Sequence, residues 1–300
     1  MSLLVEDPEA PVDPRALPQR SPLYFAWRRF TANRAACAGG IVLLVIVLMA
    51  ILAPFLTKGD PTDQAYLTQS LAFPSAEFWF GVDDLGRDFF TRIVYGARVS
   101  LTIGLAAAFF SVAIGVPLGA LAGYFGGKVD WAVMRVIELF SVVPSLLAAM
   151  LLGALTRGGF LTIITIAALF GWVQVCLLVR AQVKAVKEKE FVRAAHALGA
   201  SPGYIIRHHL IPNSISPIIV GFVLAMPLAM MLEASLSFLG IGVPPPTPSW
   251  GQMINTGTNF MFYYWHMAVF PTAALALTVL ATTLFGDGLR DAFDPTMKGR

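Results

Sequence analysis

The chain has 300 residues, of which 57% are hydrophobic and only 13% are charged, with a mean hydropathy of +0.71. Soluble domains carry about 25% charged residues, so this composition excludes a soluble protein and indicates an integral membrane protein. The net charge of +3 is poor evidence for nucleic-acid binding, and we expect no nucleic-acid partner. Cys37 and Cys176 lie in or beside different apolar stretches, so neither a disulfide nor a metal framework is predicted.

Six apolar stretches are long enough to cross a bilayer. A hydrocarbon core of about 30 Å needs roughly 20 apolar residues in a helix, and backbone groups in lipid must bond within their own segment. We therefore predict an all-α membrane fold with six transmembrane helices. They cover residues 36–56, 99–122, 131–155, 160–179, 214–238 and 267–285, with local kinks at Pro117, Pro144 and Pro227.

The distribution of Lys and Arg predicts the orientation. These residues gather before the first span, between the second and third, around the polar stretch after the fourth, and at the end of the chain. The other side has only five: Lys58, Arg87, Arg92, Arg98 and Arg157. By the positive-inside rule, both termini lie in the cytoplasm. The first span is interpreted as a retained anchor, because no small-residue cleavage site follows it.

These elements give the predicted organisation of the chain. A cytoplasmic N-terminal segment (1–35) precedes the first transmembrane helix (36–56). An extracytoplasmic loop (57–98) follows, in which Asp88 is a candidate cap for an amphipathic helix over 89–97. The core (99–288) holds five transmembrane helices and a polar segment, residues 189–213, and a cytoplasmic tail (289–300) ends the chain.

The polar segment predicts two short helices joined by a turn. Residues 190–198 form the first, which ends at Gly199 because glycine tolerates the left-handed conformation needed just past a helix end. Ser201 then caps a second helix, which begins at Pro202 and runs to about His209.

The first of these helices offers two kinds of surface. Ala194, Ala195 and Ala197 leave it thin, so that another protein could approach closely, whereas Phe191 and Leu198 supply bulk for a pocket. One interpretation is a docking element for a partner outside the bilayer. The other is an ordinary amphipathic loop that lies on the lipid headgroups.

The run Arg193, Ala194 and Ala195, followed by Gly199 and then by Ile211 and Pro212, resembles the EAA loop of ABC importer permeases. In that family the loop docks into a groove of a cytoplasmic ATPase and transmits its opening and closing to the membrane helices. This chain departs from the pattern at the first position, where the usual glutamate is Arg193. Residues 189–213 are therefore named the coupling loop.

Five further segments resemble the dipeptide, oligopeptide and nickel permeases, and more closely the second of their two paired permease subunits. They are GVDDLGRD (81–88), YGARVS (95–100), ASLSFLG (234–240), PPTPSWG (245–251) and GDGLRD (286–291). Residues 27–34 and 53–54 fit the same subunit, so the resemblance covers roughly residues 25 to 295.

This resemblance implies the type I ABC importer permease fold and a bacterial or archaeal inner-membrane location. It also implies an assembly in which the chain forms a heterodimer with a homologous permease and works with two cytoplasmic ATPases, which carry ATP and Mg, and an extracytoplasmic binding protein. The expected cargo is a di- or oligopeptide. Nickel and oligosaccharides are the alternatives that the wider family allows.

The chain itself lacks the motifs of an energy-converting enzyme. It has no Gly-x-x-x-x-Gly-Lys-Ser/Thr phosphate cradle, so ATP hydrolysis is assigned to a partner, and no cofactor or metal is expected in this chain. A secondary transporter would need a complete pathway in one chain, commonly built from repeated halves, and no convincing internal repeat is present.

Polar residues of the extracytoplasmic segments suggest contacts on that side. Asp83, Asp84, Arg87 and Trp250 are candidate contacts for a binding protein. Two alternatives stay open for the carboxylates. They could bind a divalent cation, or they could form turns that brace the loop, with Arg87 and Arg92 neutralising the acids.

Ionisable residues inside the membrane are costly and often functional. Glu233 has no basic neighbour in the sequence, and we expect it to line the translocation pathway together with Met226 and Met230, whose soft side chains suit an adaptable passage. The alternative is a hydrogen bond between helices of the bundle.

Other intramembrane residues predict packing. Glu138 follows Arg135 by three residues, which favours an ion pair on one helix face. Gln174 is interpreted as a polar link between helices. Glycines at 115, 119 and 123 form a smooth stripe for close contact with a neighbouring helix.

Overall fold

The computed structural model describes residues 22–156 and 158–293. Residues 1–21, 157 and 294–300 lie outside the described residues. These include Arg157, most of the predicted N-terminal segment (1–35) and much of the tail (289–300). Throughout the described ranges the regular elements are helices, apart from a single bridge between Val82 and Asp88. The prediction of an all-α fold is confirmed.

The described helices follow the chain in a simple order. The α-helices are α1 (Pro22–Ala32), α2 (Arg34–Ile51), α3 (Ala53–Leu56), α4 (Phe89–Phe125), α5 (Gly127–Val142), α6 (Ser145–Leu155), α7 (Phe160–Lys187), α8 (Glu190–Ala197), α9 (Pro202–Ile205), α10 (Ile215–Phe238), α11 (Trp250–Phe260) and α12 (His266–Phe293). Single turns of other helix types cover Leu67–Gln69, Ile206–Leu210 and Pro212–Ser214.

Five of these helices or helix runs are long and apolar enough to cross a membrane, and a sixth span results if α5 and α6 are counted together. That pair is bent by 80°, so the predicted third span (131–155) is broken and not merely kinked. The break lies at Val143 and Pro144, where Val143 adopts an extended conformation. Proline disfavours the helical conformation in the residue before it, which explains why the helix ends there.

Helix α4 is longer than predicted. It runs without interruption from the predicted amphipathic segment (89–97) into the second span, so the two predicted helices are one. Asp88 caps it as expected, because its carboxylate accepts a hydrogen bond from the Thr91 N–H at 2.8 Å. Arg98 does not interrupt the helix, since its guanidinium donates to the carbonyls of Ala50 and Ile51 at the end of α2.

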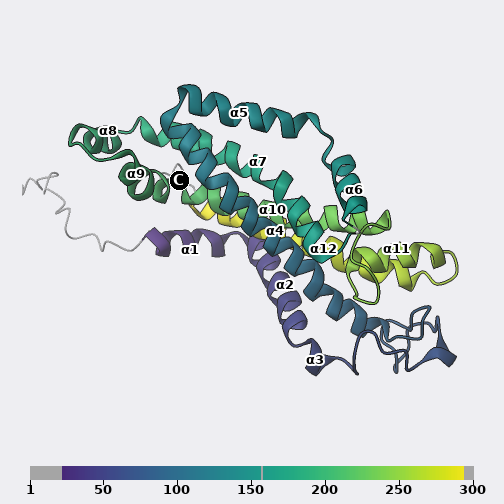
Figure 1. Cartoon of the computed structure of the whole chain (residues 1–300). Coiled ribbons are helices and arrows are strands. Elements are labelled where there is room, and N and C mark those ends of the chain that lie inside the picture. The colour runs from purple at the N-terminus through teal and green to yellow at the C-terminus, as the bar shows by residue number, and fades with distance from the viewer. Residues whose placement is uncertain (1–21, 157, 294–300) are drawn as a thin grey trace, which may run out of the picture.

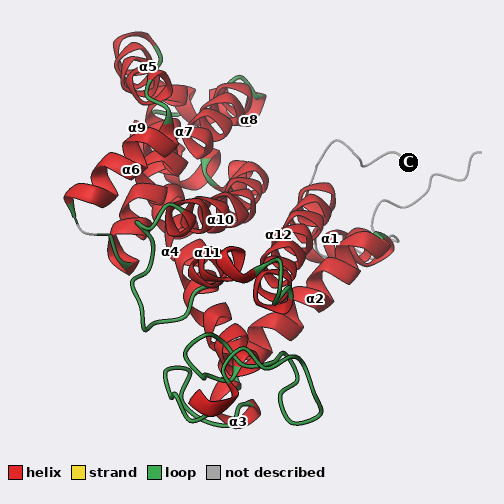
Figure 2. Cartoon of the chain, turned by 90° about the vertical axis from the view of Figure 1, so that its right-hand side faces the viewer, coloured by secondary structure: helices red, strands yellow, loops and turns green. Residues whose placement is uncertain are grey.

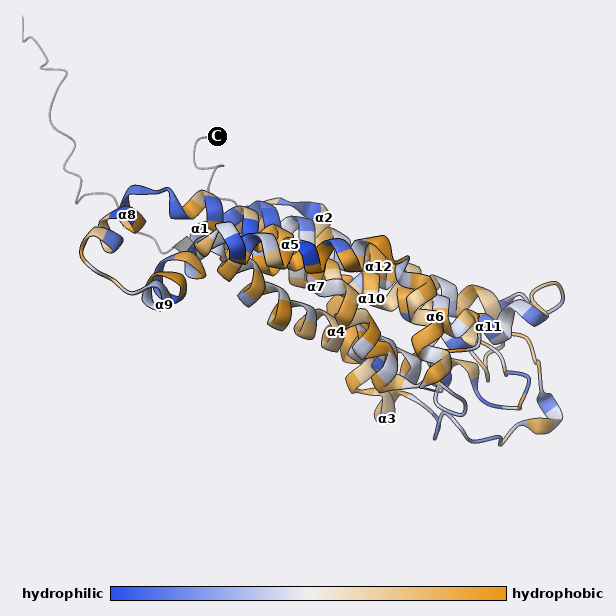
Figure 3. Cartoon of the chain, turned by 45° about the horizontal axis from the view of Figure 1, so that its top comes forward, coloured by the Kyte–Doolittle hydropathy of each residue, from blue (hydrophilic) through white to orange (hydrophobic). Residues whose placement is uncertain are grey.

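The bundle has two distinct ends (Figure 1). The coupling loop with α8 and α9 lies at one end, together with the beginning of α1 and the end of α12. The segment between α3 and α4 lies at the opposite end with α11. Figure 2 shows α1, α2 and α12 along one edge of the bundle and α5 at the other edge. Hydrophobic residues predominate along the middle of most long helices, whereas hydrophilic residues gather near α8 and in the loops beside α11 (Figure 3).

Close packing of α4 against α7 forms the centre of the bundle. A Cβ atom at Gly115 would lie 2.7 Å from the Trp172 carbonyl oxygen, and one at Gly119 would lie 2.6 Å from the Cys176 carbonyl oxygen. The two backbones therefore approach as closely as only glycine permits. This contact confirms the predicted role of the glycine stripe.

Candidate functional site

The coupling loop forms the helix–turn–helix that its sequence predicts. Helix α8 is followed by Gly199, which has a φ of +82° in the left-handed region. Ser201 caps the second helix by accepting a hydrogen bond from the Tyr204 N–H at 3.3 Å. Helix α9 then continues through a π-type turn to Leu210, close to the predicted end.

Buried apolar side chains hold this loop against the bundle. Val192, Ile205 and Leu210 join one cluster with Val183 and Val186 of α7. The opposite side of α8 is open, since Leu198 is 88% exposed and Phe191, Ala194 and Ala197 are also exposed. The element is thus fixed to α7 on its inner side and presents an apolar outer surface.

The loop is covalently continuous with two long helices. Helix α7 ends at Lys187, with two residues between it and α8, and the turn Pro212–Ser214 leads directly into α10. A displacement of the coupling loop therefore acts on α7 and α10 together. This geometry suits an element that transmits movement into the bundle.

Polar contacts fix α5 to α7 near the same end. Arg180 donates to both carboxylate oxygens of Asp130, with 2.7 Å between Nη2 and Oδ2. Lys184 Nζ lies 2.7 Å from Asp130 Oδ2. Sequence reasoning missed this cluster, although the spacing of Arg180 and Lys184 by one helical turn could have indicated a shared acidic partner.

A hollow lies in the middle of the bundle between α4, α6, α7 and α10. Its volume is about 380 Å³, and we name it the midbundle groove. Apolar side chains of α10 line it, and the polar groups at its surface are uncharged: Ser111, Ser145, Gln174 and Ser235. Gln174 is exposed, so it lines this groove and does not link helices as predicted.

The residues predicted to line the pathway lie on the other face of α10. Met226 and Met230 are buried and crowd the position of Gly104 on α4, and Glu233 is buried as well. Leu228, Met231 and Ser235 face the groove instead. The helical period explains the difference, because residues 226, 230 and 233 share one face and residues 228, 231 and 235 share the opposite one.

Glu233 forms hydrogen bonds between elements of the bundle, which was the alternative to a place in the pathway. Its Oε1 accepts hydrogen bonds from the hydroxyls of Ser237 and Ser249, both at 2.8 Å. Ser249 also caps α11 by accepting from the Gln252 N–H at 3.1 Å. The carboxylate therefore joins the end of α10 to the start of α11, and its burial contradicts an open pathway position.

Trp250 is a structural anchor. It is only 2% exposed, and its indole N–H donates to the Ile93 carbonyl at 3.0 Å. Its backbone N–H lies 3.3 Å from the Ser100 hydroxyl oxygen. These bonds fix α11 to α4, so the predicted direct contact of Trp250 with a binding protein is contradicted by its burial.

The acidic cluster before α4 is largely internal. Asp83 and Arg87 are buried, and Asp83 Oδ2 lies 2.6 Å from Arg87 Nε and 3.3 Å from Arg92 Nε. Burial, with a smaller effect of the adjacent Asp83 carboxylate, raises the pKa of Asp84, whose side chain is 25% exposed. Asp83 and Arg87 thus brace the segment, and their burial contradicts a direct role in docking.

Among the residues that the structure describes, no group of three or more histidine, cysteine or acidic side chains could hold a metal ion. The predicted pair of Arg135 and Glu138 is present, with 2.5 Å between Nη1 and Oε2, and both side chains are about half exposed. The predicted ion pair of Glu138 with Arg135 is therefore confirmed.

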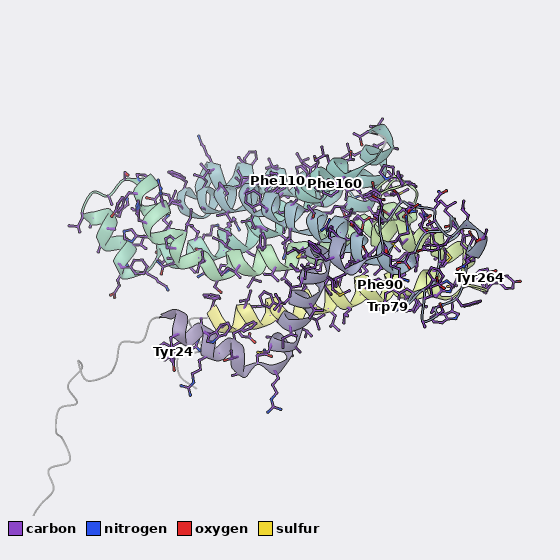
Figure 4. The ribbon with its side chains drawn as sticks, turned by 90° about the horizontal axis from the view of Figure 1, so that it is seen from below. Tyr24, Trp79, Phe90, Phe110, Phe160 and Tyr264 are labelled. Carbon is purple, nitrogen blue, oxygen red and sulfur yellow. The ribbon has the colours of Figure 1, made fainter. Side chains whose placement is uncertain are left out.

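An aromatic layer closes the end of the bundle opposite to the coupling loop. Phe80 stacks on Phe270 with 4.2 Å between ring centroids, and Trp79 contacts Phe90 edge to face. Figure 4 shows Trp79, Phe90 and Tyr264 at this end, far from Tyr24. His266 is buried in the same layer, a position that sequence reasoning missed because it lies at the boundary of the last span.

Two family models match the chain. The description "Binding-protein-dependent transport system inner membrane component" applies to residues 115–299, and "N-terminal TM domain of oligopeptide transport permease C" applies to residues 21–74. The chain is 43% identical over 274 residues to the dipeptide transport system permease protein DppC of Bacillus subtilis, which covers 91% of this chain and 85% of the relative.

Two other relatives are similar over nearly the whole chain. The oligopeptide transport system permease protein OppC of Bacillus subtilis is 40% identical, over 91% of this chain and 89% of its own length. The glutathione transport system permease protein GsiD of Pectobacterium atrosepticum is 37% identical, over 93% of each.

Solved structures show the same fold. A chain of the inward-facing MetNI methionine ABC transporter matches with a TM-score of 0.54 and 17% identity, over 68% of this chain and 97% of that one. A second crystal form gives a TM-score of 0.55. The predicted type I importer permease fold is therefore confirmed.

Proposed function

This chain belongs to the binding-protein-dependent inner membrane components of ABC importers, and we propose that it forms half of a translocation pathway for di- and oligopeptides. The homologous permease that completes the pathway, two ATPases at the coupling loop and an extracytoplasmic binding protein are the proposed partners. The relatives named for dipeptide, oligopeptide and glutathione transport favour peptides over nickel or oligosaccharides.

One observation carries this proposal. The coupling loop is continuous with α7 and α10, and these two helices supply most of the lining of the midbundle groove. An ATPase that grips the exposed side of α8 would therefore move the walls of the groove directly. The uncharged lining suits a passage that releases its substrate, since a strongly binding charged site would retain it.

The outer surface of α8 gives the test. We expect Leu198→Glu to weaken ATPase binding and ATP-driven dipeptide uptake at least about tenfold, because a carboxylate would replace an apolar side chain that the ATPase buries. The measurement uses the complete importer in liposomes, with labelled dipeptide, and co-purification of the ATPases. Tyr204→Glu serves as the control, since Tyr204 is exposed on the other short helix.

Two outcomes would contradict the proposal. One is dipeptide uptake by this chain alone, driven by an ion gradient without ATPases. The other is a purified wild-type complex that contains no ATPase. Uptake of nickel or an oligosaccharide but not of peptides would leave the permease function intact and replace the proposed cargo.

A further inference from the structure

A separate hollow lies beside the coupling loop, between the end of α4, the end of α7 and helices α8 and α9. Its volume is about 530 Å³, and we name it the basic pocket. Tyr124 and Phe125 of α4 form one wall, and the coupling loop adds the apolar residues Val192, Ala197, Pro202 and Ile205. The pocket is distinct from the midbundle groove, with which it shares no lining residue.

The charged lining of this pocket is mostly basic. Lys187, Arg193 and His196 face it, against one acidic residue, Glu188. Lys187 is held in place, because its Nζ donates to the Tyr124 carbonyl at 2.8 Å and lies 5.5 Å from the centroid of the Tyr124 ring. Arg193 is exposed and, within residues 22–156 and 158–293, forms no ion pair.

Two neighbouring basic residues on α7, in contrast to Arg193, do form ion pairs. Arg180 and Lys184 both pair with Asp130, outside the pocket. An arginine whose charge meets no carboxylate among the described residues, on the wall of a pocket with aromatic sides, is a binding group for an anion. Its planar guanidinium suits a carboxylate, with which it can form two parallel hydrogen bonds.

We propose that the basic pocket receives a carboxylate side chain of the ATPase subunit and that Arg193 is its principal partner. The proposal rests on the proposed function, because it assigns a chemical partner to the loop that the ATPase grips. Arg193 and Ala197 line the pocket from α8, and Leu198 is the next residue along the chain. One protein surface can therefore cover Leu198 and insert an acidic side chain beside Arg193.

The position of the loop favours a protein over a lipid headgroup as the source of the anion. Helices α8 and α9 project beyond the ends of α4 and α5, away from the apolar middle of the bundle (Figures 1 and 3). A headgroup would have to leave the bilayer surface to follow them. A soluble subunit approaches from that direction without such a displacement.

The test compares ATPase binding by charge variants of the complete permease pair in nanodiscs. We expect Arg193→Gln to weaken binding about tenfold and Arg193→Glu to weaken it further, because two carboxylates would then face each other. Arg207→Glu is the matched control, since Arg207 is exposed on the same loop but does not line the pocket. The affinity of this control for the ATPase should change less than about threefold. Added salt should reduce the difference in ATPase affinity between Arg193→Gln and wild type.

A chemical cross-link identifies the partner group. In the Arg193→Lys variant, a carbodiimide should join the new amine to the facing carboxylate as an amide with net loss of water, and mass spectrometry should locate an Asp or Glu of the ATPase. Arg207→Lys should give no such product at that acidic residue.

Two results would overturn the inference. Arg193→Glu could bind the ATPase as wild type does, or more tightly. The loss of binding could also vanish in nanodiscs of purely zwitterionic lipid, which would make an anionic headgroup the occupant. A wild-type pair that binds no ATPase would instead overturn the proposed function, so the two failures are distinguishable.

Discussion

The carboxylate of Glu233 shows how one buried residue can connect the end of one helix to the start of the next. It accepts hydrogen bonds from Ser237, one turn further along α10, and from Ser249 at the start of α11. Because Ser249 also caps α11, the Glu233 side chain sets where that helix begins relative to α10. We interpret it as a positioning residue.

Substitution of Glu233 tests this role. We expect Glu233→Ala to lower the free energy of unfolding by about 2–4 kcal/mol, because it leaves two buried hydroxyls without their acceptor and creates a cavity. Glu233→Gln keeps an acceptor oxygen and should retain most of the stability and of the peptide uptake. Thermal unfolding in detergent and uptake by the complete importer measure the two effects. A loss of uptake in Glu233→Gln at unchanged stability would restore the pathway interpretation.

The sequence identified Glu233 as important but not its surroundings. Its type and its place in an apolar span marked it as costly to bury, and the alternative of an interhelical hydrogen bond was open from the start. The choice depended on Ser249, which lies 16 residues away beyond the end of α10. The burial of Met226 and Met230 differs from the prediction for a related reason, since helical periodicity groups them with Glu233 but does not say which face is buried.

At the scale of elements, the contact between α4 and α7 is the clearest case in which spacing alone predicts packing. Glycines four residues apart must share a helix face. The structure brings that face against the carbonyls of Trp172 and Cys176. The break between α5 and α6 was less predictable, because proline in a membrane helix can produce either a kink or an interruption, and neighbouring helices decide between them.

Gly119 offers a direct test of the α4–α7 contact. A methyl group there would lie 2.6 Å from the Cys176 carbonyl oxygen, so Gly119→Ala must push the helices apart. We expect a loss of about 1–3 kcal/mol in the free energy of unfolding. Gly203→Ala is the control, because no atom lies within 4 Å of the added carbon and alanine favours helix. Equal melting temperatures for the two variants in detergent would contradict the packing account.

At the scale of the whole molecule, much of the apolar surface has no partner within the chain. Only 17% of the α2 span is buried, and large side chains such as Leu147, Leu151 and Leu161 are exposed. Lipid and the proposed second permease are the environments that suit this surface. Composition predicted this property correctly, whereas the assignment of each face to lipid or to protein depends on an assembly that one sequence does not contain.

The orientation of the chain in the membrane is the last prediction. The coupling loop lies at the end of the bundle where the described chain begins and ends, and the excess of Lys and Arg predicts that this end lies in the cytoplasm. In a background with Cys37 and Cys176 replaced, a membrane-impermeant maleimide should label Glu77→Cys on intact spheroplasts. It should label Lys189→Cys only after permeabilisation.

Both test positions are exposed in the structure, so access through the membrane and not burial decides the labelling. Labelling of both sites after permeabilisation is the control for reactivity. The reverse pattern on intact spheroplasts would place the coupling loop outside the cell, where no ATP is available to an ATPase. Because the proposed function needs ATPases at that loop, a reversed orientation would remove its energy source and leave the sequence resemblance without a working mechanism.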